Sequence, residues 1–210
     1  MGCMKAAAIG VCVHSGWAAV VAITGGQGAE EVLDRRRVVI IDSKVAGAAQ
    51  PYHYVAKKEI PAAEKHLTFC ASESARLAFE ALSRLSTELR GRDFMLTSAA
   101  ILLSSARILP DLKRILASHP LIHTAEGEFF RQAFRAAFEK LKIPVIGIRT
   151  RDLDDSAVKA FGRAASTIQK RIGGMGRALG PPWTQDEKMA ALAAAIVLGG
   201  TQSKGRALGA

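Results

Sequence analysis

Cysteine is scarce in this chain: 210 residues contain three, Cys3, Cys12 and Cys70, and no two of them form a C-x-x-C pair. An odd number of cysteines without metal-ligand spacing argues against a disulfide framework and against a zinc knuckle. We therefore expect reduced, mostly buried thiols and a cytoplasmic location.

Aromatic residues are also few, at 6% of the chain, whereas 49% of it is apolar and 23% is charged. This is the composition of a globular protein, and it excludes a disordered chain. With so few aromatics, the core must depend on Ala, Val, Leu and Ile. The length predicts one domain over residues 1–199, followed by a disordered tail at 200–210.

The chain lacks an uninterrupted apolar run long enough for a membrane helix. Residues 6–24 come closest, but His14, Ser15 and Gly16 interrupt them near the middle. A polar turn inside hydrocarbon is costly, so two valine-rich halves around a turn predict a buried β-hairpin. We expect no membrane partner.

Acidic residues are outnumbered, 19 against 29 Lys plus Arg, which leaves a net charge of +10. Such an excess favours nucleic acid or another phosphate-bearing ligand as partner. Arg36 lies in the densest basic run, residues 35–37, and would point opposite to its neighbours on a strand. Arg171 and Arg177 belong to a second cluster, and we take these three as candidate anion-binding residues. A solvated strand edge, protected from aggregation by charge, is the alternative for residues 35–37.

Hydrophobic periodicity predicts alternating strands and helices. We expect strands at 6–13, 17–24, 32–41, 94–103 and 144–149, and helices at 72–90, after Pro110, from Pro120 to about 142, and at 155–171 and 184–198. Residues 42–71 are expected to be a long loop insertion, and 173–182 a glycine-rich connection. The order β-β-β-α-β-α-β-α-α predicts an α/β fold with a mixed five-stranded sheet and helices on both faces. The first three strands would be antiparallel, and two parallel strands would follow through helical crossovers. The ribonuclease H-like fold is one such layout.

Two segments resemble a known family. Residues 9–16 (IGVCVHSG) are similar to the first hairpin of Holliday-junction resolvases of the ribonuclease H-like superfamily, and residues 186–193 (DEKMAALA) are similar to that family's terminal helix. The resemblance implies a ribonuclease H-like fold. It also implies divalent metal held by carboxylates from the first strand, the fourth strand and the last helix.

The chain departs from this pattern at the carboxylates. His14 stands at the first-strand position, Ser104 and Ser105 end the fourth strand, and Met189 follows Asp186 where a second acid is implied. One carboxylate cannot hold two magnesium ions. The first hypothesis is therefore a binding or scaffolding domain for nucleic acid or another anionic ligand, with the metal-carboxylate site lost.

The second hypothesis is a metal-dependent hydrolase of phosphate esters, a nuclease or phosphatase. Its catalytic residues would be His14, His123, Glu126 and Asp186, and the first three would hold a divalent metal or activate a water. His123 and Glu126 are three residues apart, on one face of the helix that follows Pro120. This hypothesis requires His14 to lie close to that face. The alternative is a His–Glu hydrogen bond that fixes the entry of the helix.

Two further segments could contact a ligand. Tyr52 and His53 lie in the predicted loop, where they could stack on a base or cover the region of His14, or could anchor the loop to the sheet. Residues 173–180 could cradle phosphate with their backbone N–H groups, or could form a flexible interhelical loop.

Overall fold

The structure, a computed structural model, describes residues 4–26, 28–104 and 108–207, with residues 201–207 described by their backbone only. These residues form a five-stranded mixed sheet in the order β3-β2-β1-β4-β5. The strands are β1 (Lys5–His14), β2 (Trp17–Thr24), β3 (Glu31–Val39), β4 (Phe94–Leu103) and β5 (Val145–Arg149). The first three pair antiparallel, and β4 and β5 are added parallel. The predicted strands and topology are confirmed.

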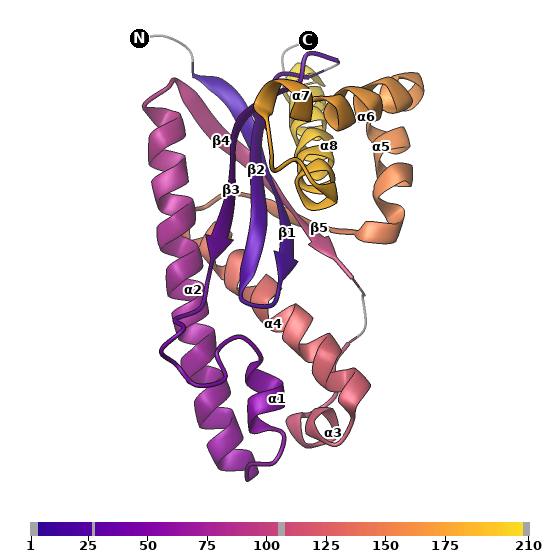
Figure 1. Cartoon of the computed structure of the whole chain (residues 1–210). Helices are drawn as coiled ribbons and strands as arrows, with labels where there is room; N and C mark the ends of the chain where they lie inside the picture. The colour runs from indigo at the N-terminus through magenta and orange to yellow at the C-terminus, as the bar shows by residue number, and fades with distance from the viewer. Residues whose placement is uncertain (1–3, 27, 105–107, 208–210) are drawn as a thin grey trace.

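Helices cover both faces of the sheet, as expected (Figure 1). The helices are α1 (Pro51–Val55), α2 (Ile60–Arg90), α3 (Leu112–Leu116), α4 (His119–Lys140), α5 (Leu153–Phe161), α6 (Ala165–Gly174), α7 (Gly176–Leu179) and α8 (Gln185–Ala207), with 3-10 turns at η1 (Thr150–Asp152) and η2 (Gly162–Ala164). The helices α2 and α4 pack on one face, and α5, α6 and α8 pack on the other.

Each face has its own core. On the α2–α4 side, Phe130, Phe134 and Phe138 form an apolar stripe along α4, and all three are fully buried. On the other side, the alanine-rich α8 lies directly against the sheet. A Cβ on Gly10 of β1 would come within 1.8 Å of the Ala190 carbonyl oxygen, so only glycine permits this approach.

The expected loop at 42–71 is wrong from Pro51 onwards. Residues 51–55 form α1, and α2 begins at Ile60 rather than at Ser72. Pro51 and Pro61 each stand in the first turn of their helix, where a missing N–H is harmless, so they begin helices rather than break them.

Three other boundaries differ from prediction. The expected helix at 155–171 divides at Gly162, whose φ of 56° is costly for other residues. Much of the glycine-rich connection is helical, in the end of α6 and in α7. The tail after Gly199 continues α8 to Ala207, and residues 208–210 lie outside the described residues.

Cys12 and Cys70 are free and buried, as expected, whereas Cys3 lies outside the described residues. In the part of the chain that the structure describes, no helix has the length and apolarity needed to cross a bilayer.

Candidate functional site

The carboxyl end of β1 meets the first turn of α8, as the predicted hairpin and terminal helix required. His14 is the last residue of β1, and its Nε2 lies 2.9 Å from Oδ2 of Asp186. Cys12 lies two residues earlier, so its side chain shares that side of the strand, and its thiol donates to Asp186 Oδ1 over 3.5 Å. We call Cys12, His14 and Asp186 the strand-end cluster.

A capping box fixes Asp186. The backbone N–H of Thr184 donates to Glu187 Oε2 over 2.8 Å, and the Thr184 hydroxyl accepts from the N–H of Asp186. Burial raises the pKa of Glu187, but the hydrogen bonds from Thr184 outweigh it and the net shift is downward. Glu187 therefore starts the helix and is already engaged there.

Stacked rings hold His14. Its imidazole stacks on Trp17 with ring centroids 4.3 Å apart and planes 12° apart. The Arg37 guanidinium lies 3.7 Å from the centroid of the Trp17 ring. The three side chains come from β1, β2 and β3, so the sheet itself orients the imidazole, whose side chain is 38% exposed.

The Cys12 thiol stays protonated near neutral pH. Burial, followed by the negative charge of Asp186, raises its pKa to about 12. A thiol of this kind donates a hydrogen bond and is a poor nucleophile.

A buried arginine occupies the end of β4. From α4, Arg131 donates through Nε to the Leu102 carbonyl (3.2 Å) and through Nη2 to the Ser104 hydroxyl (2.6 Å). Burial lowers the pKa of Arg131, and its pairing with Glu128 partly offsets this. The guanidinium packs over Gly127, where a Cβ would come within 3.2 Å of both Nη atoms. This explains the interior glycine, and it puts a cation where the resemblance implied a carboxylate.

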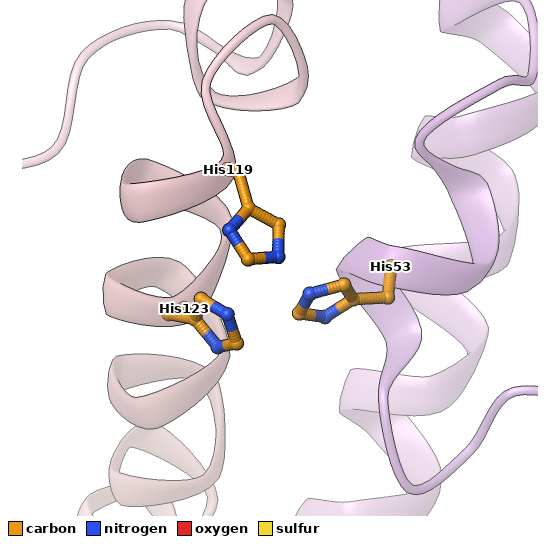
Figure 2. Close-up of side chains that lie close together, drawn as sticks. All are labelled: His53, His119 and His123. Carbon is orange, nitrogen blue, oxygen red and sulfur yellow. The ribbon is translucent and has the colours of Figure 1, made fainter.

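A second cluster joins α1 and α4. His53 of α1 faces His119 and His123 of α4, and one nitrogen from each ring lies within 4.8 Å of the others (Figure 2). Glu126 Oε2 lies 2.8 Å from His53 Nδ1, and Oε1 accepts the backbone N–H of His53 over 3.1 Å. We call His53, His119 and His123 the histidine cluster.

The expected centre of His14, His123 and Glu126 is therefore wrong in its grouping. The structure assigns His14 to the strand-end cluster and His123 to the histidine cluster, and the partner of Glu126 is His53 rather than His123. His123 faces α1, a helix that the loop prediction for residues 42–71 did not contain. Sequence reasoning missed His119, although its i, i+4 spacing to His123 puts both on one helical face.

Tyr52 and His53 belong to α1, so they do not form a loop over His14. Tyr52 packs edge-on against Phe129 with ring centroids 6.1 Å apart, which supports the anchoring alternative. Burial, followed by the charge of Glu126, raises the pKa of the Tyr52 hydroxyl.

The arginine run alternates faces as predicted, but Arg36 is neutralised. It pairs with Asp34 and with Glu88, at 2.5 and 2.6 Å. On the other face, Arg35 donates to the carbonyls of Leu179 and Gly180, both over 2.8 Å, and so holds the end of α7. Arg35 and Arg36 are therefore engaged within the protein, whereas Arg37 is exposed and lies over the Trp17 ring.

A groove of about 690 Å³ lies beside the first turn of α8. It is lined by Lys170, Gly173, Gly174, Gly176, Arg177, Gly180, Pro181, Trp183 and Lys188. Of the predicted anion-binding residues, Arg177 lines the groove and Arg171 does not. The Trp183 indole N–H donates to the Ile172 carbonyl over 2.9 Å, which fixes the ring at the edge of the groove. We call this surface the basic groove.

Comparison with known proteins identifies the fold. No family model matches the chain, and no curated protein matches its sequence. T. thermophilus RuvC in complex with a Holliday junction substrate superposes with a TM-score of 0.54 at 9% identity, over 94% of this chain and 95% of that one. A second Thermus thermophilus RuvC structure gives 0.53 at 11% identity, over 94% and 96%. An Aquifex aeolicus member of the Ppx/GppA family gives 0.36 at 8% identity, over 76% and 40%. The chain has the ribonuclease H-like fold.

Proposed function

We propose that this ribonuclease H-like domain binds nucleic acid through its phosphates and does not cleave it by a two-metal mechanism. The observation that carries the proposal is at the ends of β1 and β4. There the strand-end cluster contains one carboxylate, Asp186, bonded to His14 and Cys12, and Arg131 is buried at the end of β4.

Two magnesium ions need several carboxylate oxygens in one place, because Mg²⁺ prefers oxygen ligands in near-octahedral geometry. Asp186 alone supplies too few of these oxygens. The buried guanidinium of Arg131 adds a fixed positive charge that disfavours a second cation nearby.

The basic groove supplies the contacts that phosphates require. Lys170, Arg177 and Lys188 present three cations, and the glycines of the wall expose backbone to a ligand. Trp183 adds a ring on which a base can stack. Lys188 and Asp186 both lie in the first turn of α8, but residues two apart point to different sides of a helix, so the groove is a separate surface from the strand-end cluster. The RuvC neighbour bound to a Holliday junction substrate agrees with a nucleic-acid ligand.

The test is fluorescence anisotropy with labelled four-way junction, duplex and single-stranded DNA over a series of salt concentrations. We expect the logarithm of the association constant to fall linearly with the logarithm of salt concentration. The triple variant Lys170→Ala, Arg177→Ala, Lys188→Ala should bind roughly tenfold or more weakly, with a salt slope smaller by about 2–3.

The matched control removes the same charge from the α1–α2 side, with Lys57→Ala, Lys65→Ala and Arg84→Ala, all exposed. It should bind within a few-fold of the wild type. Equal weakening of DNA binding by both triple variants, or a DNA affinity that does not depend on salt, would contradict the proposal that the basic groove binds the phosphates. Junction cleavage with Mg²⁺ or Mn²⁺ that Asp186→Asn abolishes would support the hydrolase hypothesis instead.

A further inference from the structure

We propose that the histidine cluster is a Zn²⁺ site that fastens α1 to α4. Its ligands are His53, His119 and His123, whose ring nitrogens already converge to within 4.8 Å of one another. Figure 2 shows the three rings turned towards a common point between the two helices. This site is built from α1 and α4, whereas the basic groove is lined by residues of α6, α7 and α8 and the segment between α7 and α8.

The spacing and chemistry of the ligands suit zinc. His119 and His123 are four residues apart on α4, so their side chains share one face, and α1 brings His53 against it. Imidazole nitrogen binds Zn²⁺ at about 2.0–2.1 Å, which puts the nitrogens of a tetrahedral site roughly 3.4 Å apart. The rings therefore need to close by about 1.4 Å at most. His119 and His123 are exposed, so their rotamers are free to adjust.

Glu126 prepares His53 to bind a metal. Its carboxylate is buried, and it accepts both the backbone N–H of His53 and a hydrogen bond from Nδ1. Keeping the proton on Nδ1 leaves the lone pair on Nε2, which is the state that a zinc-ligating histidine needs. Carboxylate–histidine–zinc arrangements of this kind recur because the carboxylate orients the ring and raises its basicity.

The metal would stabilise α1, a helix that is too short to be stable by itself. α1 has five residues, far fewer than an isolated helix needs to persist in water. Three protein ligands leave the fourth zinc position to water, since two of the ligands face solvent. Without a metal, Glu126 would still hold His53, but the three rings would contact one another by edge-on packing, with centroids 4.4–5.5 Å apart.

The experiment titrates Zn²⁺ into chelator-treated full-length protein at neutral pH, against a chromogenic zinc indicator, with melting temperature as a second readout. We expect one tight equivalent and a zinc-dependent rise in melting temperature. His53→Ala and His123→Ala should each weaken binding by about 100-fold or more, and Glu126→Gln by about 10–100-fold. His66→Ala, at a histidine outside the cluster that packs on Tyr54, should leave both the zinc affinity and the zinc-dependent rise in melting temperature unchanged. Circular dichroism checks that each variant folds.

The strand-end cluster is the competing zinc site, and two measurements separate it. Zinc affinity should survive in His14→Ala, and the Co²⁺-substituted protein should show visible bands without a thiolate charge-transfer band. No Zn²⁺ binding by the wild type, binding unchanged in His53→Ala and His123→Ala, or a thiolate band from Cys12 would each overturn the proposal.

Discussion

Cys12 illustrates how a single residue is altered by its place in the fold. Its thiol sits under α8, donates to Asp186, and has its pKa raised to about 12 by burial and by that carboxylate. The same carboxylate is bonded to His14 Nε2, so Asp186 contacts both other members of the strand-end cluster. Asp186 is thus the positioning residue of the strand-end cluster.

The raised pKa of Cys12 predicts a loss of stability at alkaline pH. Below about pH 9 the thiol is protonated in both states; above it the unfolded chain ionises first, while the folded protein keeps its proton until about pH 12. The free energy of unfolding should therefore fall through this window, and Cys12→Ala should remove that part of the fall. Urea unfolding at a series of pH values measures it. The stability gap between wild type and Cys12→Ala should narrow as pH rises, and parallel curves would contradict the assignment.

The contact between β1 and α8 is set by small residues. Ala190, Ala191, Ala193 and Ala194 are fully buried, and the Ala190 carbonyl lies over Gly10. This close approach brings Asp186 within hydrogen-bond reach of His14. The small residues at this contact therefore set both the position of α8 and the distance between Asp186 and His14.

Adding one methyl group at Gly10 should separate these elements. In Gly10→Ala the Cβ would lie 1.8 Å from a backbone oxygen, so α8 must move, at a cost of about 3 kcal/mol or more in unfolding free energy. The control is Gly173→Ala in α6, where the added Cβ would meet no atom from outside its own helical turn within 4 Å, and the unfolding free energy should rise by up to about 1 kcal/mol. Urea unfolding compares the two. Similar effects of both substitutions would show that the close approach does not limit stability.

At the scale of the whole molecule, ion pairs leave the basic excess of +10 untouched, because that figure already counts every acidic side chain. Arg36, Arg76 and Arg149 each pair with acidic side chains, whereas the net charge of the chain is +10. Like charges across one compact domain repel, and salt screens that repulsion.

Sodium chloride should therefore raise the melting temperature while it weakens DNA binding. We expect a rise of about 2–4 °C per kcal/mol of relieved repulsion in a protein of this size. Removing three cations takes the net charge from +10 to 10 − 3 = +7, so either triple variant should show a smaller rise. Thermal melts over a salt series measure this. A melting temperature that falls with sodium chloride would contradict net repulsion.

The local pattern of apolar residues was enough to predict the strands of the sheet and much of α4. A strand with a buried face shows alternating or continuous apolar residues. A helix with one buried face repeats its apolar residues every three or four positions, as Phe130, Phe134 and Phe138 do. Hairpin connections and the handedness of crossovers then leave few strand orders to choose from. The meeting of His14 with Asp186 followed from that topology.

The partners of individual polar groups could not be inferred in this way. His53 and Glu126 are 73 residues apart, and only the packing of α1 on α4 brings them together. Whether Pro51 and Pro61 break or begin a helix depends on what the following residues pack against, which no local window contains. The periodicity of a sequence assigns residues to the buried or exposed face of an element. Contacts between two buried faces depend on how closely the elements pack in the tertiary structure. In this protein, glycine and alanine set the distance between β1 and α8.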